Sequence, residues 1–359
     1  MLVLLLLLPA LLPVPVRAYE DVETELGEQL EIREVEEAAP ELPGSVGVLD
    51  NTDPEGVLLQ LFTGALKTEM LRNALRSACA VLLMILGFSA LKGCFQLEGS
   101  TLDPVELAGT AAIALTVSSG QSGLLELGYQ TVAKLQDFAN VLLPVLASAV
   151  TASGQFSAGA AKYSAAALFL NLLVNAVNGM ALPLVQLYFA AAVAEAATDS
   201  GVISGAVNLL KWMVTMTLTV IMLAFTLYLS ICSITSGAAD AALTRSAKTL
   251  VSTALPVIGG IAADAAGAIL ASAGVIQKSV GVFGLLAVTA LVLGPFAYVG
   301  SHYLLFKGAS AIASGVAGGR LARLAGRCSE AFGMTLACLG ACSLLLYFSI
   351  FSMLSSFSL

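Results

Sequence analysis

Charged residues are scarce in this sequence. They make up 11% of its 359 residues, whereas 58% are hydrophobic and the mean hydropathy is +0.92. Ordinary soluble domains contain about 25% charged residues. A chain with so little charge cannot present a hydrated surface over most of its length, so lipid must surround most of it. The composition predicts a membrane protein.

Histidine is nearly absent as well, and the cysteines form no cluster. His302 is the only histidine, and the six cysteines show no CxxC spacing. Structural zinc sites need clustered thiolates and imidazoles, and histidine-dependent catalytic arrangements need partners that one histidine cannot supply. Cys338 and Cys342, at i and i+4, are interpreted as apolar packing residues on one helix face. The sequence predicts no metal site, no cofactor and no catalytic residues.

Two further signals are missing. The chain has no GxxxxGK[ST] loop, which excludes nucleotide hydrolysis by that route. Its basic residues are spread along the chain, so a nucleic acid would find no binding surface. The one basic cluster, Arg320, Arg323 and Arg327 with Lys307 nearby, is typical of a cytoplasmic loop between membrane spans. We expect a membrane protein that is not an enzyme and whose main surroundings are the lipid bilayer.

The N-terminal part divides into an apolar and an acidic segment. Residues 1–18 are apolar, and Val16 and Ala18 suit a signal-peptidase site, so we predict a signal peptide; an uncleaved anchor is the alternative. Residues 19–56 hold 13 acids, ten Glu and three Asp, against the single base Arg33, a net charge of −12. We expect this segment outside the cytoplasm, as a docking arm for a basic partner or as a solvated spacer.

The rest of the chain predicts an all-α, polytopic transmembrane helical bundle. Residues 57–76 suit an amphipathic helix at the membrane surface, and residues 77–359 suit the transmembrane domain. A span needs about 20 apolar residues. Charge-free runs mark the spans at 77–91, 107–125, 138–161, 163–194, 212–239, 279–306 and 331–359, and the run 249–277, broken only by Asp264, would be an eighth. The pattern indicates six to eight spans.

The prolines indicate an internal repeat. Leu143-Pro144-Val145 recurs as Leu255-Pro256-Val257, 112 residues later, and another proline follows each of the two after 39 residues. This spacing predicts repeats at about 103–191 and 212–306, which is the plan of many transporters. The helices are expected to break at Pro144, Pro183, Pro256, Gly259, Gly260 and Pro295. Because Lys and Arg favour the cytoplasmic side, we favour eight spans and inverted repeats over six spans with dipping proline segments.

A few polar residues inside the predicted spans are the functional candidates. Asn171, Asn175 and Asn178 follow one helix face, and such a stripe either hydrogen-bonds neighbouring helices or lines a wet cavity. Asp264 is the one acid in an otherwise apolar segment that Lys278 closes. An acid at membrane depth is a functional candidate by default, although an ion pair with Lys278 would be a structural explanation.

Taken together, these residues resemble a known family. The order is a signal sequence, an acidic stretch, NVLLPVLASAVTASGQFSAGAAKYS at 140–164, SGAADAALTRSAKTL at 236–250, and LPVIGG followed by Asp264, Gln277-Lys278 and Gly281. In these motifs the chain resembles the stage III sporulation protein AE family of endospore-forming bacteria. The resemblance covers nearly the whole mature chain, and PVIGG with its downstream acid is the most specific part.

The resemblance implies a component of the stage III A sporulation complex, in the mother-cell membrane around the forespore. The partners would be the other proteins of that complex, namely an ATPase, ring-forming proteins and small membrane subunits. It implies a channel-like or permease-like subunit of a secretion complex that is needed for forespore development. A structural membrane scaffold that transports nothing, and an unrelated secondary transporter, are the alternatives. The family brings no catalytic residues.

Overall fold

The structure, a computed structural model, describes residues 32–39, 54–65, 68–95, 104–198, 200–254, 259–316 and 319–354. Within these ranges every regular element is a helix. Six of the described helical stretches are long and apolar enough to cross a membrane. Helices suit this setting because they satisfy their own backbone hydrogen bonds where no water is available. The prediction of an all-α, polytopic helical bundle is confirmed, while the predicted signal peptide at 1–18 lies outside the described residues.

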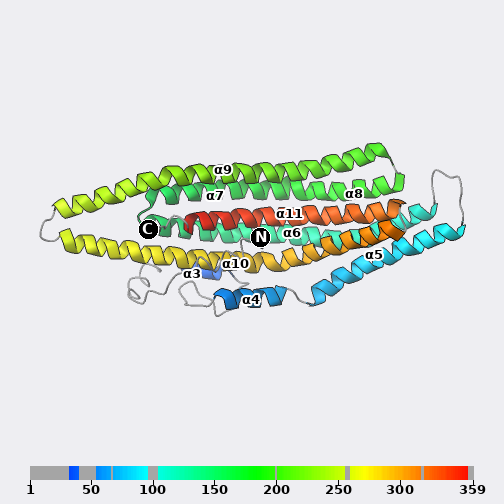
Figure 1. The fold of residues 1–359 in the computed structure, drawn as a ribbon, viewed down its shortest axis with the longest axis horizontal. Coiled ribbons are helices and arrows are strands. Elements are labelled where there is room, and N and C mark those ends of the chain that lie inside the picture. Colours follow the sequence, from blue (N-terminus) through cyan, green and yellow to red (C-terminus); the bar gives the residue numbers. More distant parts are fainter. Residues whose placement is uncertain are drawn as a thin grey trace.

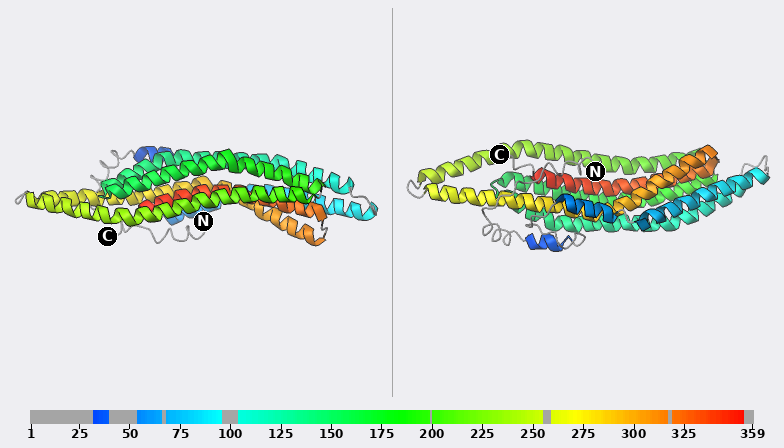
Figure 2. Two further views of the ribbon diagram at one scale, coloured as in Figure 1. Left: turned by 90° about the horizontal axis from the view of Figure 1, so that it is seen from above. Right: turned by 60° about the horizontal axis from the view of Figure 1, so that its bottom comes forward.

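The long helices lie side by side in an elongated bundle (Figure 1). Their order along the chain is α5 (Thr68–Phe95), α6 (Pro104–Ala152), α7 (Phe156–Ala176), α8 (Leu182–Thr198), α9 (Gly201–Ala254), α10 (Gly259–Val316) and α11 (Gly319–Leu354). The helix α11 is central, because it contacts each of the other six. In Figures 1 and 2, α9 and α10 extend together beyond the other helices at the end where they approach each other.

Small residues let the central helices approach closely. A Cβ atom added at Gly284 of α10 would lie 2.7 Å from Leu142 Cδ2 of α6. One added at Gly281 would overlap the side chain of Leu354 on α11. In membranes the hydrophobic effect does not drive helices together, because lipid is as apolar as a neighbouring helix. Close packing of backbones through small residues is therefore a usual basis of helix association there. Cys338 and Cys342 of α11 are free and buried in this core, as the packing interpretation predicts.

The eight-span arrangement is wrong, because two predicted separate spans belong to longer helices. The run 107–125 and most of the run 138–161 lie on the single helix α6, which has 49 residues. The segment 249–277 is not a span of its own either, since α10 begins at Gly259 and continues to Val316. Six candidate spans remain among the described residues.

Two of the predicted helix breaks are also wrong. Pro144 lies inside α6 and Pro295 lies inside α10, and neither helix is interrupted there. Proline is tolerated within membrane helices because neighbouring groups and local adjustments satisfy the freed backbone. Pro144 frees the carbonyl of Asn140, one turn earlier, and the helix continues past it.

Of the other two prolines, the structure describes one, and it lies beside irregular backbone. Pro183 follows a π-helical turn at Val177–Ala181, between α7 and α8. Pro256 falls between the end of α9 and the start of α10 and is outside the described residues, whereas Gly259 and Gly260 are the first residues of α10. Pro183 and Pro295, 112 residues apart, therefore occupy different surroundings, one after a π-helical turn and one inside a long helix. The internal repeat is unconfirmed.

The segments before the long helices pack against the bundle. The short helix α3 (Ile32–Glu37) belongs to the acidic segment 19–56, and its Ile32 and Val35 are buried in the main hydrophobic core beside α6. This described part of the acidic segment is therefore not a freely solvated spacer. The predicted surface helix 57–76 is divided between α4 (Pro54–Ala65), which contacts α10, and the beginning of α5.

Candidate functional site

The three predicted asparagines do not form one stripe. Asn171 and Asn175 are exposed on α7, and Asn171 Oδ1 accepts a hydrogen bond from Gln136 Nε2 of α6 at 2.9 Å. Asn178 instead lies in the π-helical turn, and its Oδ1 is buried without a hydrogen-bond partner among the described residues. Of the two interpretations, hydrogen bonding to a neighbouring helix applies to Asn171.

Asp264 and Lys278 cannot form the ion pair that the sequence allowed. Both lie on the continuous helix α10, 14 residues apart. At 1.5 Å per residue this is about 21 Å along the helix axis, far beyond the reach of the two side chains. Lys278 is half-buried next to Gln277, whose amide donates to the Met353 carbonyl at 2.7 Å. The side chain of Asp264 lies outside the described part of the chain.

A row of polar side chains follows the outer face of α6. Glu126, Gln130, Lys134, Asp137 and Asn140 are spaced by four or three residues and are all exposed. We call these five residues the α6 polar face. Within it, Gln130 Nε2 donates to Glu126 Oε1 at 2.9 Å. The sequence analysis missed this face because it assigned the charges at 126–137 to a connection between two spans.

A crossing by the middle of α6 places part of this face in the hydrocarbon core. The core is about 30 Å thick, which corresponds to about 20 helical residues. The candidate span on α6 is Leu107–Ala152. Within those bounds, every stretch of about 20 residues other than 107–125 contains Glu126, Lys134 or Asp137. At least one exposed charge therefore lies at membrane depth unless the bilayer covers 107–125 alone.

A second polar cluster joins three helices inside the bundle. Arg327 of α11 binds Glu195 of α8 through Nε to Oε2 at 3.1 Å and Nη2 to Oε1 at 3.2 Å. Glu330, one turn further along α11, binds Lys211 of α9 at 3.0 Å and accepts a hydrogen bond from the Tyr188 hydroxyl of α8 at 2.5 Å. Arg327 was predicted to belong to a basic loop, but it lies on a helix and its charge is paired.

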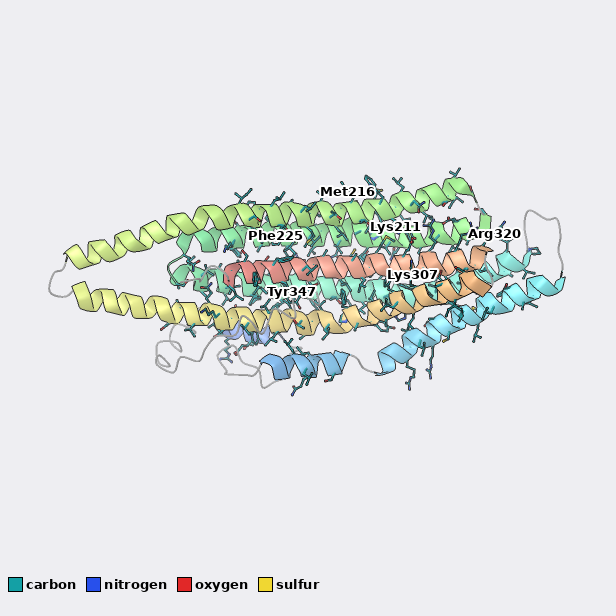
Figure 3. The ribbon with its side chains drawn as sticks, in the orientation of Figure 1. Lys211, Met216, Phe225, Lys307, Arg320 and Tyr347 are labelled. Carbon is teal, nitrogen blue, oxygen red and sulfur yellow. The ribbon has the colours of Figure 1, made fainter. Side chains whose placement is uncertain are left out.

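A long groove opens beside this cluster, between α9 and α10, with α11 as its floor. Its volume is about 900 Å³. Lys211, Lys307 and Glu330 line it together with Thr215, Thr219, Thr226 and apolar residues of all three helices. Figure 3 shows Lys211 on α9 and Lys307 on α10 at similar positions along the long axis of the bundle. No sequence pattern indicates this groove, because its walls come from residues far apart in the chain.

The comparison with protein families assigns the described bundle. Residues 80–356 match the family of stage III sporulation protein AE. The chain belongs to this family. The matched residues contain all of the helices α6 to α11 and most of α5, so both polar clusters and the groove fall within the family's region. Neither the comparison with curated proteins nor the comparison with solved structures gives a match.

Membership in the stage III sporulation protein AE family confirms the sequence resemblance and a role in sporulation. Together with the six candidate spans, it makes the chain a multi-pass membrane protein of sporulating cells. The match begins at residue 80, after α3 and α4, so the acidic segment is not part of the matched region.

Proposed function

We propose that this protein is a channel-like or permease-like membrane subunit of the sporulation secretion complex that connects mother cell and forespore. Family membership supports the sporulation role. The observation that supports transport is the α6 polar face, which has exposed carboxylate, ammonium and amide groups on a helix that crosses the membrane. We expect this face to line a water-filled path between this chain and its neighbours in the complex.

The physical argument rests on the cost of leaving these groups in lipid. A single charged side chain at the centre of a membrane helix costs about 2.5–3.5 kcal/mol on insertion scales. Ionisable residues in membrane spans almost always face a protein interior or a water-filled cavity, and they often mark a transport path. The α6 polar face turns away from its own bundle, so another subunit or water must cover it.

The distribution of basic residues supports an orientation. Arg320 and Arg323 lie within five residues of the start of α11, at the end of the bundle where α10 meets α11. We call this the basic end. Because short segments rich in Lys and Arg stay in the cytoplasm, the basic end faces the mother-cell cytoplasm in our proposal. The mature N-terminus then lies outside the cytoplasm. An ATPase partner would act at the basic end, and ring-forming partners would act at the opposite end.

A scaffold that assembles the complex without transporting anything is the second candidate. It is favoured by the cluster of Arg327, Glu195, Glu330 and Lys211, in which every charge is paired with another charge of the same bundle. Paired charges hold helices together and need no solute. In that case the α6 polar face would be covered by a partner protein instead of water.

Thiol accessibility separates these two functions. Gln130→Cys and Asn140→Cys place thiols on the α6 polar face, and Leu115→Cys places one on an apolar part of the same helix, where Leu115 is 75% exposed. Each is made in a chain without the six native cysteines and tested in membranes of sporulating cells that retain the complex. We expect a charged thiol reagent to label the two polar positions but not position 115. If both polar positions are as protected as position 115, the face is dry and the transport proposal fails.

A further inference from the structure

The groove between α9, α10 and α11 has apolar walls despite its threonines. The hydroxyls of Thr215, Thr219 and Thr226 each donate a hydrogen bond to the carbonyl four residues earlier, at 2.8–2.9 Å. These three side chains therefore have no hydroxyl hydrogen left for an occupant, and they present methyl groups. The floor on α11 is formed by the small residues Gly333, Ala337, Gly340 and Ala341. A ligand that lies along these walls would therefore contact mainly methyl and other hydrocarbon groups.

One end of the groove is positively charged. Lys307 has no hydrogen-bond or ion-pair partner among the described residues. Lys211 is bound to Glu330, but Glu330 also lies 3.5 Å from Arg327 Nη1. Three cations (Lys211, Lys307 and Arg327) face two carboxylates (Glu195 and Glu330), so 3 − 2 leaves one positive charge. A single anionic group would balance this end.

The two lysines lie where headgroups are expected. Lys211 is followed by the charge-free run 212–239, and Lys307 is preceded by the uncharged run 279–306. At 1.5 Å per residue each run is about 42 Å long, which is enough to cross the hydrocarbon core of about 30 Å. The lysines therefore stand at one boundary of the core, and the apolar walls extend from them into it.

We propose that this groove is a binding site for an anionic phospholipid. The phosphate lies between Lys211 and Lys307, and an acyl chain follows the methyl-lined wall over the floor of α11. Basic pockets between membrane helices are known settings for anionic headgroups. The site is separate from the α6 polar face, which lies on a different helix, so it does not depend on the transport proposal.

The size of the groove favours a lipid over a transmembrane helix of a partner. Sites for small molecules have volumes of about 300–1,000 Å³, and the groove has about 900 Å³. A helix that crosses the core is about 30 Å long and about 10 Å wide, a cylinder of roughly 2,400 Å³. Such a helix would leave most of its surface outside the groove, whereas an acyl chain is narrow enough to lie along it.

The single tryptophan allows a direct test with the full-length chain. Trp212 directly follows Lys211 on α9 and is 59% exposed. It does not line the groove, so its fluorescence reports on lipid around the charged end, and the variants below separate the groove from the rest of the surface. The protein is reconstituted in phosphatidylcholine vesicles that contain either brominated phosphatidylglycerol or brominated phosphatidylcholine, and quenching is measured as a function of mole fraction. We expect phosphatidylglycerol to quench more strongly at equal mole fraction. Equal quenching by the two lipids would overturn the proposal.

Three variants locate the effect. Lys307→Gln should lower the preference for phosphatidylglycerol about fivefold, the effect expected for one lysine near an anionic headgroup. Ala337→Phe fills the floor without changing charge and should also remove the preference. Arg323→Gln removes one exposed charge of α11 outside the groove and should keep it. If either groove variant keeps the wild-type preference, or if a partner helix crosslinks into the groove, the proposal is wrong.

Discussion

Arg327 of α11 and Glu195 of α8 form a two-point ion pair across the bundle, with nitrogen–oxygen distances of 3.1 and 3.2 Å. The planar guanidinium matches the carboxylate geometry, so the pair fixes the relative orientation of the two side chains and also stabilises the bundle. Their side chains are only 20% and 17% exposed. The pair lies beside Glu330, which connects the same arginine to Lys211 and Tyr188. The relative positions of α8, α9 and α11 are therefore coupled through one arginine.

The first prediction concerns this arginine. Arg327→Gln leaves two partly buried carboxylates with less compensation, and removing one partner of a buried pair costs about 3–5 kcal/mol. Because the pair is partly exposed, we expect a loss of roughly 2–3 kcal/mol in the free energy of unfolding. Thermal unfolding of the purified protein in detergent measures it. The double variant Arg327→Gln/Glu195→Gln should be less destabilised than the sum of the single variants. Strict additivity would show that the pair contributes nothing.

The arginine pair illustrates which parts of the fold the sequence predicted. Hydropathy correctly predicted a helical membrane protein, because long apolar runs must form helices in lipid. It could not predict the pair, because Arg327 and Glu195 are 132 residues apart and only tertiary contact brings them together. The same limit applies to the groove, whose walls come from three helices.

The continuity of α6 was missed for a different reason. A span prediction that uses charge-free runs ends at Glu126 and starts again after Asp137, so it assigns the charges between them to a loop. The spacing of the α6 polar face, by four and three residues, carries the helical signal that the run lengths hide. Among the predicted candidates, the structure places Asn171 beside α6 through Gln136, while Asp264 and Lys278 belong to a different helix, α10.

The second prediction tests the close approach of α10 to α6. Gly284→Ala places a methyl group 2.7 Å from Leu142, so the leucine must move, and overpacking of this kind costs about 1–3 kcal/mol. Gly308→Ala is the matched control on the same helix, because a Cβ atom there meets nothing within 4 Å. The control should be neutral or up to about 1 kcal/mol more stable, as alanine favours helix over glycine. Equal unfolding temperatures for the two variants would contradict this packing.

The third prediction keeps Asp264 as a functional candidate. It is the only acidic residue of α10, and it lies in the second turn of that helix, which begins at Gly259. Asp264→Asn keeps the size of the side chain and removes its charge. We expect sporulation to fall while the amount of protein in the membrane stays normal. Heat-resistant spore counts and immunoblots measure the two quantities, and normal sporulation at a normal protein level would show that the charge is dispensable.

The last prediction concerns how the chain crosses the membrane, which the helix ends make decidable. The ends of α8 and α9 that approach each other lie at the basic end of the bundle, as do those of α10 and α11 (Figure 1). The far ends of α9 and α10 lie at the opposite end. With the basic end in the cytoplasm, residue 246 on the distal part of α9 lies outside, whereas the earlier eight-span arrangement would place it inside.

Two single-cysteine variants, made without the native cysteines, test this arrangement. Ser246→Cys lies on distal α9, and Ser314→Cys lies near the end of α10 at the basic end. In intact cells, a membrane-impermeant thiol reagent should label position 246, and position 314 should react only after the membrane is permeabilised. Because short segments with Arg320 and Arg323 resist translocation, the reverse pattern is disfavoured. If position 246 is protected in intact cells, the prediction is wrong and the α9–α10 extension is cytoplasmic. It would also invert the orientation that the proposed function requires.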